Sequence, residues 1–325
     1  MNERLKVLCD SFIAAKVEIK AVFGIEYDEI YTLCANMFVS RGMMPDSRAL
    51  RECRELLKKN SGLFSSFRWT MEAPVSTLLA ASDSPELMLS KVKQAHSVLR
   101  RHFPDSQYLV YAAAVLADMS GETAESIASR ARTIYEMMKR RHPFLTAYED
   151  HVFCVLLAMS RRSDEELTDE TEYIYNALRK MSDSNTIQSV SHILTLADGA
   201  PEAKCALLSD IFYGLKDLGK KYGSGGELAV LAALASVSPD VNTAVTDIAD
   251  ADDYLSQCKD YRGFFNCGAH TRLMHATLLT AASYAPVGKD VSGTLPMIAA
   301  EDALLYIYDV SSSTDAAVAT MQLNM

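Results

Sequence analysis

The chain has 325 residues, of which 49% are hydrophobic and 23% are charged, and its formal net charge at pH 7 is −10. This composition excludes a largely disordered chain and provides for a large core. The charge is uneven, since residues 1–162 carry 22 basic and 19 acidic side chains whereas residues 163–325 carry 10 and 23. The acidic second half disfavours nucleic acid as a partner.

Residues 1–26 are predicted to form an N-terminal capping helix. Its apolar residues recur at helical spacing: Leu5, Leu8, Phe12, Ala15 and Ile19. The segment lacks the apolar core of a signal peptide. No stretch of the chain reaches the roughly 18 apolar residues of a membrane span. We therefore expect a cytoplasmic protein that has no membrane partner.

From residue 27 to residue 285, a weak self-similarity recurs about every 40 residues. Each unit opens with a short apolar helix and continues, through a turn, into an amphipathic helix that ends in a basic residue. The apolar helices align at Phe38-Val39, Leu79-Ala80, Leu116-Ala117, Leu157-Ala158, Leu196-Ala197, Leu234-Ala235 and Leu279-Thr280. The pattern predicts an all-α fold of about 14 to 16 helices, an α-α superhelix (solenoid) of about seven helical hairpins.

The first helix of each unit is predicted to lie in an inner layer. Residues 151–159 and 228–235 are apolar around the whole helix circumference, and such helices are buried on all sides. The amphipathic helices then form the outer layer. The residues expected to be almost fully buried are Phe153, Leu157, Leu196, Leu231 and Leu234. We find no strand signal.

Residues 286–325 are assigned to a C-terminal cap, which completes a single all-helical repeat domain spanning residues 1–325. Pro286, Gly288, Gly293 and Pro296 predict a loop, and a helix is expected from Met297 to Asp309. A second, short helix is expected near the C-terminus. The sequence leaves open whether the array is an open arc or a closed ring.

Four segments of the chain resemble an uncharacterised bacterial family, the domain of unknown function 4003. They are Gly62–Arg68 (GLFSSFR), His142–Thr146 (HPFLT), Ser191–Leu194 and Arg272–Met274. The likeness extends from Met1 to about Ala282. It implies an all-helical fold and supplies no activity, cofactor or catalytic residue.

No cofactor or metal is expected from the sequence. The seven cysteines are scattered and form no Cys-x-x-Cys pair, so buried free thiols are favoured over disulfides or a zinc site. They are Cys9, Cys34, Cys53, Cys154, Cys205, Cys258 and Cys267.

Four residues form the predicted ligand-binding set: Arg68, His192, Arg272 and His275. Arg68 ends the Gly62–Arg68 loop, where it offers a bidentate donor to an anion; the alternative is a capping glycine followed by two phenylalanines that pack on the next hairpin. His192 and His275 occupy equivalent positions in their units, and Arg272 lies one helical turn before His275. The alternative for both histidines is a hydrogen-bonded place in the core.

Two functions are compatible with these features. The first is a non-enzymatic repeat protein that binds a peptide or protein partner on its inner surface. The second is a hydrolase- or lyase-type enzyme on a closed α/α barrel, with Glu72, Asp150 and Glu227 as carboxylates before inner helices. Asp250-Ala251-Asp252-Asp253 also matches the acid motif of triterpene-type cyclases, although the expected aromatic lining is missing. The sequence favours the binding function.

Overall fold

The computed structural model, which describes residues 1–24, 27–119, 123–262, 268–285 and 291–323, is built from helices. These residues form 15 α-helices, three 3-10 helices and no β-strand, so the all-α prediction is confirmed. The helices are α1 (Glu3–Phe23), α2 (Asp28–Val39), α3 (Ser47–Asn60), η1 (Trp69–Met71), α4 (Glu72–Ala80), α5 (Pro85–Leu99), α6 (Gln107–Met119), α7 (Ala124–Arg141), η2 (Tyr148–Asp150), α8 (His151–Ala158), α9 (Asp164–Leu178), α10 (Ser184–Leu196), α11 (Pro201–Asp217), α12 (Glu227–Val237), α13 (Val241–Gln257), η3 (Lys259–Tyr261), α14 (Ala269–Tyr284) and α15 (Val291–Leu323).

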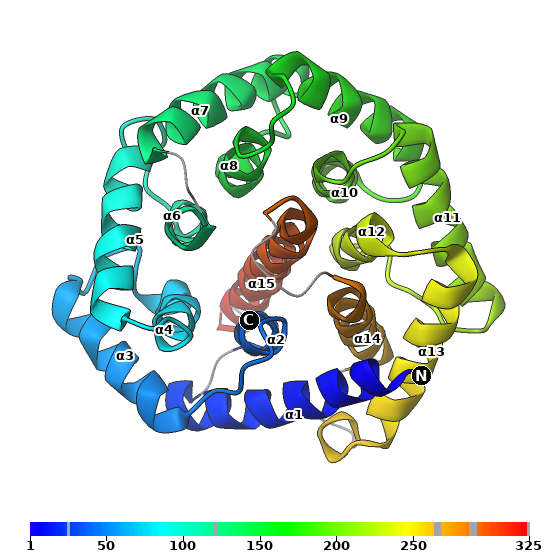
Figure 1. The fold of residues 1–325 in the computed structure, drawn as a ribbon, viewed down its shortest axis with the longest axis horizontal. Coiled ribbons are helices and arrows are strands. Elements are labelled where there is room, and N and C mark those ends of the chain that lie inside the picture. The colour runs from blue at the N-terminus through cyan, green and yellow to red at the C-terminus, as the bar shows by residue number, and fades with distance from the viewer. Residues whose placement is uncertain (25–26, 120–122, 263–267, 286–290, 324–325) are drawn as a thin grey trace.

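The α-helices form two concentric layers around a central helix (Figure 1). The odd-numbered helices α1 to α13 make an outer belt, and the even-numbered helices α2 to α14 make the inner layer. Every residue of α8 is buried, as are residues 228–235 of α12. The five leucine and phenylalanine residues predicted to be buried are at most 8% exposed, which confirms the inner-layer assignment.

The outer helices bury one face only. Helix α3 buries Leu50, Cys53 and Leu57, which are three and four residues apart and therefore share one side of the helix. Polar side chains determine where several of these helices begin. At α9, Ser163 and Glu166 form a capping box, in which each side chain accepts a hydrogen bond from the backbone of the other.

The outer belt closes into a ring because α1 packs against α13 and α14 as well as against α2 and α3. Arg4 of α1 donates to the backbone carbonyls of Ala282 (3.3 Å) and Ala285 (3.1 Å). Tyr254 of α13 donates to Asp10. Of the two shapes that the sequence left open, the structure shows the ring.

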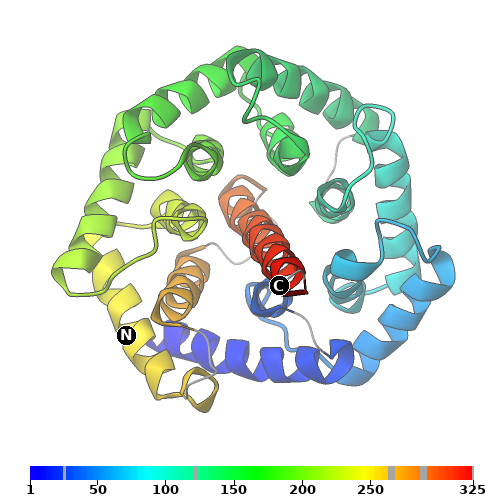
Figure 2. The same ribbon diagram turned by 180° about the vertical axis from the view of Figure 1, so that it is seen from behind.

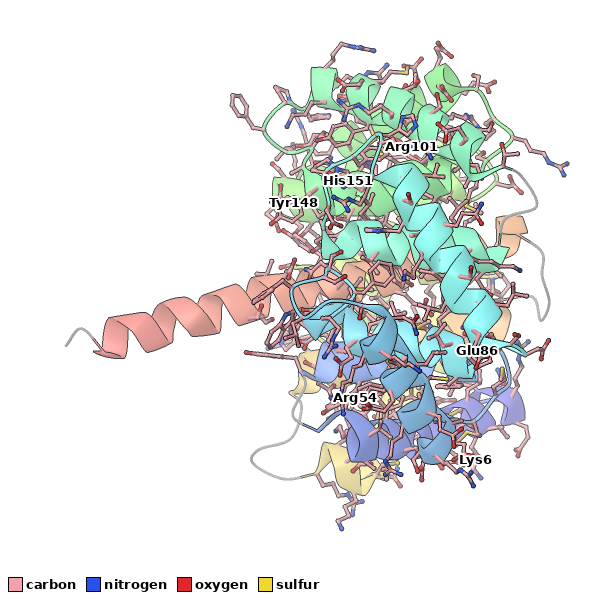
Figure 3. All side chains as sticks on the ribbon, turned by 90° about the vertical axis from the view of Figure 1, so that its left-hand side faces the viewer. Lys6, Arg54, Glu86, Arg101, Tyr148 and His151 are labelled. Carbon is pink, nitrogen blue, oxygen red and sulfur yellow. The ribbon has the colours of Figure 1, made fainter. Side chains whose placement is uncertain are left out.

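Helix α15 runs through the centre of the ring, as both face-on views show (Figures 1 and 2). It contacts six inner helices: α2, α6, α8, α10, α12 and α14. Ala299, Ala300, Leu304 and Leu305 of α15 are fully buried. The C-terminal part of α15 leaves the ring on the side where Tyr148 lies and projects from the body (Figure 3).

The loop and the two helices predicted within the C-terminal segment are wrong, because one helix spans the described part of it. Residues 286–290 lie outside the described part of the chain, but the helix begins at Val291 instead of Met297 and continues without a break to Leu323. Pro296 lies inside the helix, where it forfeits the hydrogen bond to the carbonyl of residue 292. Burial of the adjacent Leu295 (3% exposed) and Met297 (6% exposed) offsets that loss.

Leu157→Ala is expected to destabilise the ring by roughly 2–5 kcal/mol, because it removes a fully buried side chain from α8. Leu87→Ala, the same change at a residue that is 56% exposed on α5, should alter stability by less than about 0.5 kcal/mol. Urea unfolding measures both values. A similar small loss for the two variants would show that α8 does not belong to the tightly packed layer.

Candidate functional site

Polar side chains of α2 and α6 bind α15 in the centre of the ring. We call these residues, Asn36, Gln107, Tyr108 and Tyr111, the seat of α15. Glu301 of α15 is 7% exposed and accepts hydrogen bonds from Asn36 Nδ2 of α2 (2.6 Å) and from Tyr111 OH of α6 (2.7 Å). Asn36 and Tyr111 are buried as well. An unsatisfied buried donor costs about 1–3 kcal/mol, so these bonds define both the depth and the rotation of α15 in the ring.

Where α15 leaves the ring, it meets the N-terminal ends of inner helices, and we call this end of the ring the exit face. Asp309 Oδ2 accepts from Gln107 Nε2 (2.5 Å) and Tyr108 OH (2.8 Å), both in the first turn of α6. The positive end of a helix dipole favours a carboxylate in this place. Three further contacts reach the starts of α2, α4 and α10: Tyr308 with Tyr27, Tyr308 with Thr70, and Tyr306 with Asn185.

A glycine allows α15 to approach α12 closely. A Cβ atom added at Gly226, the residue before α12, would lie 2.5 Å from Ile307 Cγ1. The backbone at Gly226 has a φ of −53°, which any residue adopts, so the glycine is required for space alone. The seat therefore selects α15 by shape as well as by hydrogen bonds.

Near the exit face, two acidic residues of α15 lie close to two acidic residues of η2. We call these four residues the acid cluster: Asp302 and Asp309 of α15, and Glu149 and Asp150 of η2. Asp302 is 1% exposed, and its Oδ1 has no hydrogen-bond partner. Burial raises the pKa of Asp302 well above its usual range, and the other three acids raise it further. Burial also raises the pKa of Asp150 to about 8, although the Ala147 backbone N–H donates to it. Near pH 7, Asp150 and Asp302 are therefore neutral.

His192 of α10, a predicted ligand-binding residue, lies next to Asp150. Its Nδ1 is 3.6 Å from Asp150 Oδ1, and neither ring nitrogen has a hydrogen-bond partner. The ring packs against Phe153, with 4.9 Å between ring centroids. Burial lowers the pKa of His192 to about 3, so the two groups form a neutral pair and not an ion pair.

His275 of α14 lies at the closure of the ring. Its Nε2 is 2.9 Å from Thr32 Oγ1 of α2, and its Nδ1 is 2.8 Å from Tyr261 OH. Phe12 of α1 packs edge-on against the imidazole at a centroid distance of 5.5 Å. Burial lowers the pKa of His275 to about 3. This is the hydrogen-bonded core position that the sequence offered as the alternative.

The structure does not bring the four predicted ligand-binding residues together. Arg68 Nε donates to Glu72 Oε2 (2.9 Å), and Arg272 Nε donates to Asp252 Oδ1 of the outer helix α13 (2.7 Å). His192 and His275 lie on different inner helices, as described above. A ligand-binding role for Arg68, His192, Arg272 and His275 stays a prediction.

Of the three carboxylates proposed for an enzyme, Asp150 alone belongs to the acid cluster. Glu72 accepts from Arg54 Nε (2.5 Å) and from Arg68, and Glu227 lies in the first turn of α12. Asp252 of the cyclase-like motif lies in the outer layer, where Lys220 Nζ also donates to it (2.7 Å). These acidic residues therefore do not converge on one site.

Large aromatic side chains are exposed on the segments that lead into α4 and α8. Phe64 and Phe144 are each 97% exposed, Trp69 is 75% exposed and Tyr148 is 55% exposed. Trp69 has a φ of +57°, which is uncommon for a residue other than glycine. In the alternative offered for the Gly62–Arg68 loop, two phenylalanines pack on the next hairpin; this agrees with Phe67, which is buried, and not with Phe64, which is exposed.

Sequence reasoning missed the acids of α15. Glu301 and Asp302 are adjacent and interrupt an otherwise apolar run. Two acids in such a run indicate buried polar groups, and this pattern could have been noticed in the sequence. Within the described residues, no three or more histidine, cysteine or acidic side chains are placed to hold a metal ion. In that same part of the chain, no helix has the length and hydropathy needed to cross a bilayer.

Comparison with known sequences agrees with the resemblance found in the sequence. The model of a family described as "Protein of unknown function (DUF4003)" matches residues 17–300. The chain belongs to this family. It is also similar to the "Uncharacterized protein YeaA" of Bacillus subtilis (strain 168), with 21% identity over 259 residues that make up 77% of each chain. No solved structure matches the chain.

Asp302→Asn is expected to change how stability depends on pH. A carboxyl group whose pKa is higher in the folded chain stabilises the fold at low pH, and that contribution is lost as the pH rises through the folded value. Asparagine has no proton to lose. The unfolding free energy of the variant relative to the unmodified chain should therefore increase as the pH rises above about 4, the pKa of an unperturbed aspartate, by up to roughly 1.4 kcal/mol per pH unit.

Urea unfolding at several pH values measures this difference. The unmodified chain should lose stability from about pH 6.5 towards the folded pKa of Asp150, which is about 8. Below pH 6.5, protonation of the buried histidines in the unfolded chain opposes the effect of the acids. Asp83→Asn, at an exposed residue, is the control. Parallel pH profiles for Asp302→Asn and the unmodified chain would show that folding does not raise the pKa of Asp302.

The two core histidines should respond differently to replacement by leucine. His275→Leu removes the hydrogen bonds to Thr32 and Tyr261 and should cost about 1–3 kcal/mol. His192→Leu breaks no hydrogen bond and removes two unsatisfied nitrogens, so its cost should be below about 1 kcal/mol. Thermal and urea unfolding compare the two variants. Equal losses would contradict the different environments of the two rings.

Proposed function

We propose that this chain is a non-catalytic cytoplasmic ring that binds an α-helical protein segment on its inner surface, with α15 as the resident occupant. The polar seat of α15 carries the proposal, because Glu301 and Asp309 of the helix meet matching donors on α2 and α6. Buried polar pairs contribute little net stability compared with apolar packing. What they supply is selection of one helix in one register, which a helix that only filled space would not need.

The proposal treats residues 1–325 as one all-helical repeat domain, a closed superhelix of about seven hairpins. Its support is the packing of α1 against α13 and α14 and the contacts of α15 with inner helices around the ring. The cytoplasmic assignment is supported by the cysteines. Cys9, Cys53, Cys154, Cys205 and Cys258 carry free thiols, as is usual in a reducing compartment.

Two further features suit a helix that exchanges with a partner. Asp302 is buried without a partner for Oδ1, so the seat contains one group that opposes burial of α15. The segments that lead into α4 and α8 expose Phe64, Trp69, Phe144 and Tyr148, and Tyr148 lies on the side of the ring from which α15 projects (Figure 3). Exposed aromatic side chains commonly mark interaction surfaces.

The enzyme alternative needs a closed ring with an open central pocket. The ring is closed, but α15 occupies its centre and packs against α8, the helix that Asp150 precedes. Release of α15 would have to come before any catalysis there. The helix-binding proposal requires the same release of α15, but another helix then fills the seat and no open central pocket is needed.

The proposal is tested by adding a synthetic peptide of residues 291–312 to the full-length chain. Trp69, the only tryptophan, reports binding by fluorescence, because the adjacent Thr70 donates to Tyr308 of α15. Glu301→Ala in the chain should weaken the resident helix and tighten binding of the unmodified peptide by about tenfold or more. The same change in the peptide should weaken its binding by a similar factor.

The matched control is Glu86→Ala, at an exposed residue on the opposite side of the ring from the projecting part of α15 (Figure 3). This variant should bind the peptide as the unmodified chain does. Exchange of the helix at this seat would be refuted by either of two results. One is that the peptide does not bind the Glu301→Ala chain; the other is that the unmodified, Glu301→Ala and Glu86→Ala chains bind it with equal affinity.

A further inference from the structure

A cavity of about 350 Å³ lies between α3, α5 and the segment that leads into α4, apart from the seat of α15. Its volume falls in the range of small-molecule sites, which is about 300–1,000 Å³. A larger hollow of about 690 Å³ lies on the outer belt at Arg141, but its charged side chains already pair, as Arg141 does with Asp169. The smaller cavity is the one with an organised polar wall.

One wall of the cavity is the Gly62–Arg68 loop, which is fixed by its own hydrogen bonds. The Ser65 backbone N–H donates to the Gly62 carbonyl (3.1 Å), and the Arg68 N–H donates to the Ser65 carbonyl (2.9 Å). Ser66 Oγ donates to Asp105 Oδ1 (2.9 Å), which ties the loop to the segment before α6. The wall is therefore formed in advance of any ligand.

A buried histidine supports this wall from α5. His96 is 7% exposed, its Nε2 is 2.9 Å from Asp105 Oδ1, and Phe67 packs edge-on against its ring at 4.9 Å. Burial lowers the pKa of His96, so the imidazole is neutral near pH 7 and donates from Nε2 to Asp105. Asp105 thus accepts hydrogen bonds from both Ser66 and His96, which are neutral donors, so one negative charge remains in the lining.

Two cations on α5 border the cavity. Lys93 and Arg100 are seven residues apart and so lie on the same side of the helix. Lys93 Nζ donates to the Asn60 carbonyl (3.0 Å), and Arg100 Nε lies 4.0 Å from Asp105 Oδ2, beyond hydrogen-bond distance. Both residues are exposed to solvent, and the ion pair of Arg100 with Asp105 is long at 4.0 Å, so an anionic ligand can approach both cations. The lining also includes Leu57 and Leu89, which are buried in the core, and we call these two residues the floor of the cavity.

We propose that this cavity binds a small organic anion, with its apolar part on the Leu57 and Leu89 floor and its anionic group between Lys93 and Arg100. The two cations face one acid that is already hydrogen-bonded, which leaves the lining net positive. An anion gains charge-assisted hydrogen bonds there, whereas a cation would meet two like charges. The site is independent of the helix-binding function proposed for the ring.

The probe is 4-fluorobenzoate, which has a carboxylate on a small apolar ring, and fluorine NMR of the full-length chain measures its affinity. Lys93→Gln and Arg100→Gln should each weaken binding by about tenfold, because each removes a charge-assisted hydrogen bond. Lys91→Gln is the matched control, since Lys91 is exposed on the same helix and does not line the cavity. Its affinity should equal that of the unmodified chain.

The neutral analogue 4-fluorobenzyl alcohol should bind at least about tenfold more weakly than the carboxylate. Equal binding of the alcohol and the carboxylate would overturn the anion site, as would affinities that Lys93→Gln and Arg100→Gln leave unchanged. No binding of 4-fluorobenzoate at millimolar concentration would overturn it as well. Both variants change exposed side chains, and unchanged melting temperatures establish that they are folded.

Discussion

Inner helices that are apolar around their whole circumference need contact on two sides, towards the outer belt and towards the centre of the ring. Helix α15 supplies the second contact, and the remaining features of the molecule depend on it. Without a central helix, residues such as those of α12 would face an empty centre. With it, the ring can close through α1 and still bury its inner layer.

Placing α15 in the centre also buries acidic side chains, because the helix brings Glu301, Asp302 and Asp309 into contact with the inner layer. Each of these acids must either find a hydrogen-bond donor or be protonated. Glu301 and Asp309 find donors on α2 and α6, whereas Asp302 stays neutral because burial and nearby acids favour its protonated form. Burial lowers the pKa values of His192 and His275, so these rings reduce the stability of the fold at low pH, whereas the buried acids reduce it at high pH. The seat of α15 therefore combines the hydrogen bonds of Glu301 and Asp309 with a buried acid, Asp302, whose protonation depends on pH, and this distinguishes it from the apolar contacts around it.

Much of the fold could be predicted from the sequence, because helical periodicity and apolar helices are local signals. The burial of Phe153 and Leu231 followed from such signals. The position of α15 could not be predicted, since it depends on contacts between residues far apart in the chain, such as Asn36 with Glu301. The same limit applies to the candidate site: His192 and Asp150 were each noticed, but for separate reasons, and their proximity appears only in three dimensions. The need for Gly226 to remain without a side chain likewise depends on Ile307.

The central claim is that α15 is seated in the ring as a separable helix. Hydrogen–deuterium exchange tests it most directly, by comparing backbone amides of residues 299–309 with those of α8 at about pH 6 and 8.5, after correction for intrinsic rates. We predict that α15 exchanges through an opening smaller than global unfolding, and that its protection relative to α8 falls further at the higher pH. Equal protection of α15 and α8 at both pH values would contradict the claim, because α15 would then be an inseparable part of the core.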